Sequence, residues 1–130
     1  MFPESHRELL SDEKRAIAYL ATIMPDGSPQ LTPVWFSFDD EGLRINTRRG
    51  RVKEQNMSAR PQVALTIQDP DETYRFIQVR GVTSHATEEG AVDHIERLSQ
   101  KYDGKPFRSL HANEGRVIFT IEPQSISINE

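Results

Sequence analysis

The sequence predicts a mainly β fold, a small antiparallel barrel of about six strands with a few short helices. Apolar and polar residues alternate over several short runs, as they do in half-buried strands. Tight turn signals separate the runs, and the clearest is Pro25-Asp26-Gly27-Ser28. Strands joined by such short turns favour antiparallel pairing over a parallel sheet. The chain has 130 residues, which predicts a single domain over residues 1–130.

Runs of alternating or apolar residues predict the strands. In chain order they are residues 16–24, 30–38, 43–47, 63–67, 74–86 and 117–128. The first two runs flank the turn at Pro25, so they predict a β-hairpin. Pro33 lies inside the second run, and proline cannot donate a hydrogen bond to a neighbouring strand. This strand is therefore expected at a sheet edge or at a bulge, and Pro123 predicts a break in the last strand.

Helices are expected in three places. Pro3 and Glu4 suit the start of a short helix in the charged N-terminal segment. Residues 51–59 predict a second short helix before Pro61. An amphipathic helix is predicted after Thr87, its expected N-cap. Its apolar residues recur at helical spacing: Ala91, Ile95, Leu98 and Tyr102.

Composition excludes several function classes. The formal net charge of −4 argues against a general nucleic-acid-binding protein. The absence of cysteine excludes disulfides, thiolate nucleophiles and cysteine-ligated metals. No metal site is expected, because the histidines share no ligand spacing: His6, His85, His94 and His111. The sequence shows neither an apolar leader nor a membrane-spanning stretch, so a cytoplasmic location is expected.

A cluster of cations lies between a predicted strand and a predicted helix. Arg48, Arg49, Arg51 and Lys53 surround Gly50, whose missing side chain would let the backbone approach a ligand. Backbone N–H groups at a helix N-terminus bind phosphate or carboxylate, especially beside arginine and lysine. Further hydrogen-bonding groups flank the cluster: Asn46, Thr47 and Asn56. The pattern indicates an anion site, and a solvated basic loop is the alternative.

Two other segments carry unusual residues. Trp35, the single tryptophan, adjoins Phe36 in a predicted strand, where neighbouring side chains point to opposite faces. Either both are core residues, or a planar aromatic ligand lies against this strand. Arg75 and Arg80 lie in a strand that otherwise suits burial, so they need partners. Salt bridges to the acidic loop at residues 69–72 are the alternative to a functional role.

No pattern predicts a catalytic acid, base or nucleophile, and the catalytic residues stay unassigned. The sequence lacks the glycine-rich dinucleotide motif, the phosphate-binding P-loop, the nucleophile elbow and the helical zinc motif. Chemistry carried by a bound cofactor is favoured instead.

The ordered set of motifs resembles the pyridoxamine 5′-phosphate oxidase-like superfamily, the FMN-binding split barrels. More narrowly, it is similar to the branch that depends on the deazaflavin coenzyme F-420. The resemblance runs from about Pro3 to Ile121 and rests on residues 21–30, 32–36, 46–47, 50–53 with Asn56, 61–65 and 79–81. The chain lacks the C-terminal Arg-Leu-x-Pro and Glu-Phe-Trp signatures of the true oxidases, which argues against vitamin B6 synthesis.

This resemblance implies a six-stranded antiparallel split β-barrel that forms a homodimer, with cofactor sites at the subunit interface. It implies an oxidoreductase that transfers hydride from reduced coenzyme F-420 to an electron-poor small molecule. Conjugated alkenes, quinones and tetrapyrroles are the expected substrate classes, with no nucleic-acid or membrane partner. An FMN-binding reductase or oxidase on the same fold and a non-catalytic cofactor carrier remain alternatives.

The resemblance also implies the cofactor-binding residues. The loop after the third strand would hold the phosphate, and the strand at residues 33–36 would lie along the ring. The strand at residues 74–78, from the other subunit, would close the site. The implied residues are Pro33, Val34, Trp35, Phe36, Asn46, Thr47, Arg48, Arg49, Gly50, Arg51, Lys53, Asn56, Tyr74, Arg75, Phe76 and Gln78.

Overall fold

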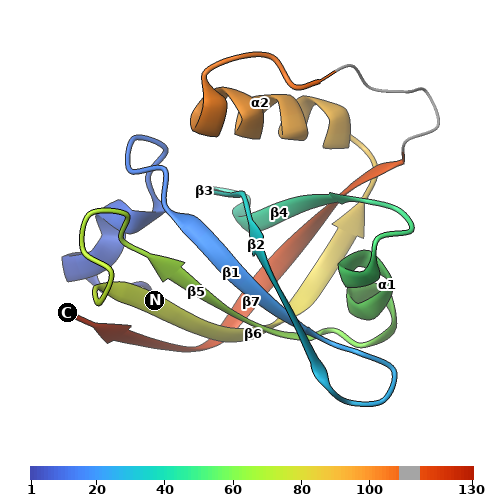
Figure 1. The fold of residues 1–130 in the computed structure, drawn as a ribbon, viewed down its shortest axis with the longest axis horizontal. Helices are drawn as coiled ribbons and strands as arrows, with labels where there is room; N and C mark the ends of the chain where they lie inside the picture. Colours follow the sequence, from blue (N-terminus) through green and yellow to red (C-terminus); the bar gives the residue numbers. More distant parts are fainter. Residues whose placement is uncertain (109–114) are drawn as a thin grey trace.

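An antiparallel sheet curls into a half-closed barrel in this computed structural model, which describes residues 1–108 and 115–130 (Figure 1). Within those residues the sheet has seven strands, in the order β2-β1-β5-β6-β7-β4-β3. The elements are a 3-10 helix η1 (Glu4–Leu10), β1 (Ile17–Ile23), β2 (Pro29–Val34), β3 (Phe36–Asp39), β4 (Gly42–Arg48), α1 (Val52–Ala59), β5 (Gln62–Gln68), β6 (Phe76–Thr87), α2 (Ala91–Asp103) and β7 (Arg116–Asn129).

The two edge strands of the sheet follow one another in the chain. β2 pairs with β1, where Tyr19 lies opposite Pro33, and β3 pairs with β4, where Phe36 lies opposite Ile45. Only Trp35 separates β2 from β3, so the sheet must curl to bring its edges together. The barrel is therefore split between these two strands. The edge position expected from Pro33 is confirmed, since β2 has a partner on one side only.

The predicted fold class is confirmed, but the strand count is seven instead of six. The predicted strand at residues 30–38 is two strands, because the chain leaves one edge of the sheet and joins the other at Trp35. The break expected at Pro123 is wrong. β7 continues through it, and the register with β6 shifts between Arg80 and Gly81, opposite this proline. The bulge absorbs a residue that cannot donate a ladder hydrogen bond.

The expected N-cap of the third helix is also wrong. α2 begins after Gly90, which has a φ of 76°, a left-handed conformation that glycine adopts without strain. The Thr87 hydroxyl oxygen instead accepts a hydrogen bond from the backbone N–H of Glu89, at 3.1 Å. The turn before the helix therefore holds Thr87 outside it.

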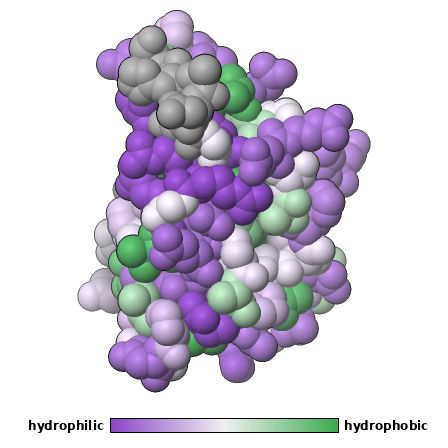
Figure 2. Space-filling view, turned by 90° about the vertical axis from the view of Figure 1, so that its right-hand side faces the viewer, coloured by the Kyte–Doolittle hydropathy of each residue, from purple (hydrophilic) through white to green (hydrophobic). Residues whose placement is uncertain are grey.

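The core fills the concave side of the curled sheet. Its largest fully buried side chains come from strands all around the barrel, among them Leu20, Phe36, Ile45, Ile67 and Phe119. α2 lies over one end of the barrel, and η1 lies at the other side near both termini (Figure 1). The face that carries α1 and the turn before it is largely hydrophilic (Figure 2). None of the helices in the described ranges has the length and apolar character needed to cross a membrane.

Candidate functional site

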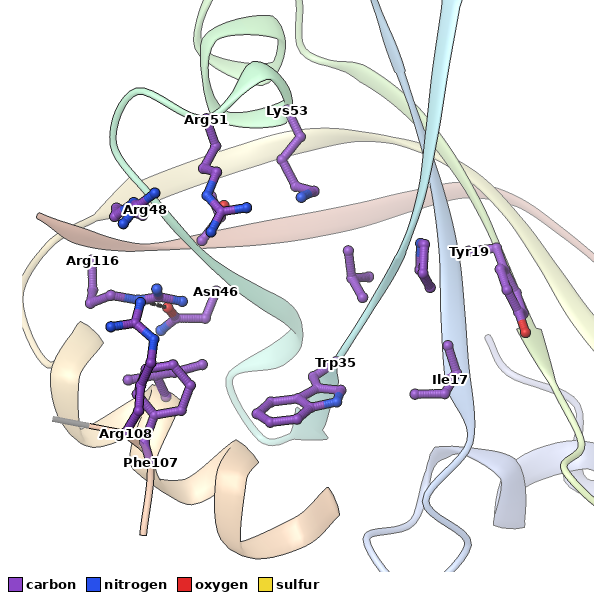
Figure 3. A pocket seen from close by; sticks show the side chains of 14 residues that line it. Ile17, Tyr19, Trp35, Asn46, Arg48, Arg51, Lys53, Phe107, Arg108 and Arg116 are labelled. Atoms are coloured by element: carbon purple, nitrogen blue, oxygen red, sulfur yellow. Dashed lines mark hydrogen bonds between the residues drawn. The ribbon is translucent and has the colours of Figure 1, made fainter. Parts of the chain in front are cut away.

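A cavity of about 700 Å³ lies at the split of the barrel (Figure 3). Residues of β1, β2, β4 and β7, of the start of α1, and of α2 and the segment after it surround the cavity. The lining residues are Ile17, Tyr19, Pro33, Val34, Trp35, Asn46, Thr47, Arg48, Ile95, Arg51, Lys53, Phe107, Arg108 and Arg116. The split therefore gives the cavity a cationic end and an aromatic and apolar end.

At the cationic end, side chains converge from β4, α1 and β7 (Figure 3). Arg48 and Arg116 lie directly opposite one another in the β4–β7 register, an arrangement of like charges that is unfavourable by itself. Burial, followed by the positive charges of Arg51 and Arg116, lowers the pKa of Lys53. No carboxylate in the described part of the chain lies within ion-pair distance of Arg51 or Lys53. A bound anion would relieve this concentration of positive charge.

The aromatic end is built on Trp35, which α2 holds from behind. Its indole stacks on Tyr102, with ring centroids 5.2 Å apart and planes 8° from parallel. The Tyr102 hydroxyl donates to the Ala16 carbonyl at 2.7 Å. The ammonium of the preceding residue, Lys101, donates to the Phe36 carbonyl at 2.9 Å. These contacts fix the indole plane, so a flat aromatic ligand can stack against Trp35 without ordering a flexible side chain.

Hydrogen bonds from Asn46 tie the cationic end to α2. Its amide nitrogen donates to the Ala91 carbonyl at 2.9 Å and lies 3.0 Å from Nδ1 of His94. Its amide oxygen accepts from Nε of Arg116 at 2.9 Å. Burial, with smaller effects of Arg44 and Arg97, lowers the pKa of His94 to about 4, so its imidazole is neutral at pH 7.

Many of the residues expected to bind a cofactor lie together in the cavity wall. They are Pro33, Val34, Trp35, Asn46, Thr47, Arg48, Arg51 and Lys53. Both segments, around Trp35 and around Arg51, therefore meet at one site although α1 and β2 are far apart in sequence. The two neighbouring aromatic residues are not both core residues. Phe36 is fully buried in the core, while Trp35 is half-buried and borders the cavity.

Other expected residues of the same segments lie outside the cavity lining. Arg49 forms an ion pair with Glu54 at 3.2 Å, and the Gly50 N–H donates to the same carboxylate at 2.8 Å. Asn56 is buried and donates to Thr22 on β1 at 3.0 Å. Together these contacts fix the turn that leads into α1. They hold the turn in the shape that aims its neighbours into the cavity.

The expected residues on β6 and just before it lie away from the cavity of their own chain. Arg75 pairs with Asp69 at 2.9 Å and also with Glu8, which matches the salt-bridge alternative. Gln78 accepts a hydrogen bond from a serine on β7, and the Tyr74 side chain is 79% exposed. Phe76 begins β6 and is half-buried. Within one chain, these residues do not reach the cavity.

Sequence reasoning missed several lining residues: Ile17, Tyr19, Ile95, Phe107, Arg108 and Arg116. Ile95 had been assigned to the apolar face of a helix, and that face borders the cavity. Arg116 stands alone in sequence and only strand pairing brings it opposite Arg48. No local motif could have found it. No group of three or more His, Cys, Asp or Glu side chains suited to a metal ion occurs in residues 1–108 and 115–130, and His111 lies outside those ranges.

A family model described as pyridoxamine 5′-phosphate oxidase matches residues 2–129 of the chain. The protein belongs to this family. A solved structure described as an F-420 reductase is 35% identical in sequence and has a TM-score of 0.84. The match covers 97% of this chain and 98% of that one. This similarity supports a place in the F-420-dependent branch of the family.

More distant structures share the fold of this family. A conserved hypothetical protein from Mycobacterium tuberculosis is 23% identical, with a TM-score of 0.75, covering 100% of this chain and 86% of that one. The heme storage protein HutZ from Vibrio cholerae is 19% identical, with a TM-score of 0.68, covering 99% and 96%. At such identities the similarity concerns the fold alone.

Proposed function

We propose that the protein is an oxidoreductase that binds coenzyme F-420 in the cavity at the barrel split. The observation that carries this proposal is the cavity itself, in which a cluster of cations faces a fixed indole. A phosphate suits the first end, and a flat tricyclic ring suits the second. The deazaflavin and FMN share a tricyclic ring, a ribityl chain and a phosphate, so the cavity suits both. The similarity to an F-420 reductase is what favours the deazaflavin.

The lining residues fit such a cofactor. Arg48, Arg51 and Lys53 would hold the phosphate together with Arg116, and Trp35 would support the ring. Once bound, the reduced deazaflavin supplies a hydride for an electron-poor acceptor. The protein's task is then to bind and orient both partners and to exclude water. The apolar wall formed by residues of β1 and β2 contributes to that exclusion.

Among residues 1–108 and 115–130, no carboxylate and no imidazole lines the cavity. The proposed mechanism therefore assigns no general acid to a carboxylate or imidazole of these residues. Solvent or a hydroxyl at the cavity, from Tyr19 or Thr47, would supply the proton that completes reduction of the acceptor. The substrate classes that suit hydride transfer are conjugated alkenes, quinones and tetrapyrroles.

We also propose that a second copy of the chain completes the site. Tyr19 and Pro33, which line the cavity, lie on the outer face of the sheet, which continues across β5 and β6. One row of directly paired residues on that face is Pro33, Tyr19, Thr66, Gln78 and Ser127. This row is uncharged, and Leu31 on the same face is 66% exposed. A homodimer through this face would bring the partner's 74–78 segment towards the cavity, as the resemblance implies.

Turnover with the reduced coenzyme tests the enzymatic part of the proposal. Purified protein is mixed without oxygen with reduced F-420 and an acceptor such as cyclohexenone or a quinone. We expect the absorbance of the oxidised deazaflavin to return in proportion to enzyme concentration for at least one acceptor class. Stable binding of the coenzyme with no transfer to any acceptor would leave the cofactor-carrier alternative. Transfer supported by reduced FMN alone would assign the protein to the flavin alternative.

A further inference from the structure

We infer that His94 is a positioning residue for the anion end of the cavity, acting through Asn46 on Arg116. His94 is outside the cavity lining, and sequence reasoning considered it only as a metal ligand. The inference rests on the proposed function in one respect: the anion is taken to be the phosphate of the cofactor. It assigns a role to a buried imidazole that the hydride transfer itself does not use.

The geometry is a continuous chain of hydrogen bonds behind the cavity wall. His94 is 5% exposed, and its Nε2 lies 2.9 Å from the Ser37 hydroxyl on β3. Its Nδ1 lies 3.0 Å from the amide nitrogen of Asn46 on β4. The amide oxygen of Asn46 then accepts from Nε of Arg116 on β7, at 2.9 Å. One side chain of α2 thus connects to a guanidinium in the cavity through a single intermediate.

The partners determine where the imidazole proton lies. An amide nitrogen can only donate, so Nδ1 of His94 must accept and carries no proton. The proton of the neutral ring is then on Nε2, which donates to the Ser37 hydroxyl. The other hydrogen of the Asn46 amide goes to the Ala91 carbonyl. Burial and the positive charges of Arg44 and Arg97 lower the pKa of His94, and Asp39 opposes them. This direction agrees with a neutral ring.

These bonds leave the Asn46 amide one favourable orientation. A flipped amide would place its oxygen against the Ala91 carbonyl and Nδ1 of His94, and its nitrogen against the Arg116 guanidinium. The contacts with the Ala91 carbonyl and with the Arg116 guanidinium would then pair like with like. In the observed orientation, the amide oxygen fixes Nε of Arg116. The Arg116 guanidinium carbon also lies 5.4 Å from the centroid of the Phe107 ring. Figure 3 shows this guanidinium beside Asn46 at the cationic end.

Two substitutions separate the nitrogens of His94. In His94→Asn the shorter amide places a hydrogen-bonding atom near the position of Nδ1, towards Asn46. In His94→Gln the longer amide reaches the position of Nε2, towards Ser37.

The probes for these variants are coenzyme F-420 and the deazaflavin nucleoside that lacks the phosphate. We expect His94→Gln to weaken F-420 binding about tenfold, the effect of disturbing one charge-assisted hydrogen bond, and to leave nucleoside binding nearly unchanged. His94→Asn should stay within about threefold of wild type for both ligands.

A second background shows whether the effect passes through the guanidinium. In Arg116→Ala protein, adding His94→Gln should cause no further loss of F-420 affinity, because the residue that His94 positions is gone. An equal loss in both backgrounds would mean a general structural role and would overturn the inference. Thermal unfolding of each variant checks that it is folded.

Nitrogen NMR of the wild-type imidazole adds a readout that needs no ligand. We expect the Nε2–H tautomer of His94, and an Nδ1–H tautomer would also overturn the inference.

Lys53→Gln distinguishes failure of the inference from failure of the proposed function. If Lys53→Gln weakens F-420 binding while His94→Gln and His94→Asn bind alike, the cavity binds the phosphate and the inference about His94 is wrong. If wild-type protein binds F-420 no better than the nucleoside, and Lys53→Gln changes nothing, the proposed phosphate site itself is wrong.

Discussion

Replacing Lys53 with glutamate weakens the binding of coenzyme F-420 by about 100-fold or more. A charge-assisted hydrogen bond in a sheltered site contributes about 1.5–3 kcal/mol, and reversing the charge adds repulsion to its loss. Burial and the neighbouring charges of Arg51 and Arg116 already disfavour the Lys53 ammonium in the absence of an anion, as the lowered pKa shows. An anion in the cavity would give this side chain the partner that it lacks among residues 1–108 and 115–130. Fluorescence titration of wild-type and variant protein with F-420 measures the effect.

The charge change itself needs a control. Arg7→Glu makes the same reversal on η1, where Arg7 is exposed and outside the cavity lining. This variant should bind F-420 as wild type does, whereas Lys53→Gln should fall between wild type and Lys53→Glu. Unchanged affinity in Lys53→Glu would show that the phosphate lies elsewhere, and equal losses in Arg7→Glu and Lys53→Glu would point to a general effect of net charge.

Gly81→Ala lowers the free energy of unfolding by about 2–4 kcal/mol, as overpacking of a buried site does. Gly81 lies at the register shift between β6 and β7, and an added Cβ would overlap the backbone carbonyl of Glu122. The obstructing atoms belong to the backbone, including that of Pro123, so they cannot move aside as a flexible side chain can. Urea unfolding followed by circular dichroism gives the difference in free energy between variant and wild type.

Gly90→Ala provides the matched comparison. Nothing lies within 4 Å of the Cβ that this change would add, but the φ of Gly90 is +76°, so its cost is only that of a left-handed residue, about 1–2 kcal/mol. We expect Gly81→Ala to be the more destabilising of the two. The reverse order would mean that β7 can move away from β6 at little cost, contrary to the close backbone contact.

Local patterns were sufficient to predict most strands and the cationic turn. The hairpin at Pro25, the edge position of Pro33 and the cluster before α1 all depend on residues near one another in sequence. The remaining features of the fold depend on pairing between strands that are far apart in sequence. The split at Trp35 exists because β2 and β3 pair with different strands, and no pattern within residues 30–38 marks where the partner changes.

The same distinction holds in the site. The sequence identified the cations around Gly50, but it could not tell which of them face the cavity. Glu54 holds Arg49 in an ion pair, so the turn directs Arg51 and Lys53 inward instead. Arg116 became part of the site only through its pairing opposite Arg48, a contact between residues far apart in the chain.

The most direct test of the proposed cofactor is a side-by-side titration of the purified apoprotein with coenzyme F-420 and with FMN. Trp35 is the single tryptophan and borders the cavity, so its emission reports on a ring that stacks there. We expect F-420 to quench this emission and to bind more strongly than FMN. Stronger binding of FMN would keep the fold and the site but contradict the deazaflavin assignment. Binding of neither ligand would contradict the account that the cavity between Trp35 and Lys53 is a cofactor site.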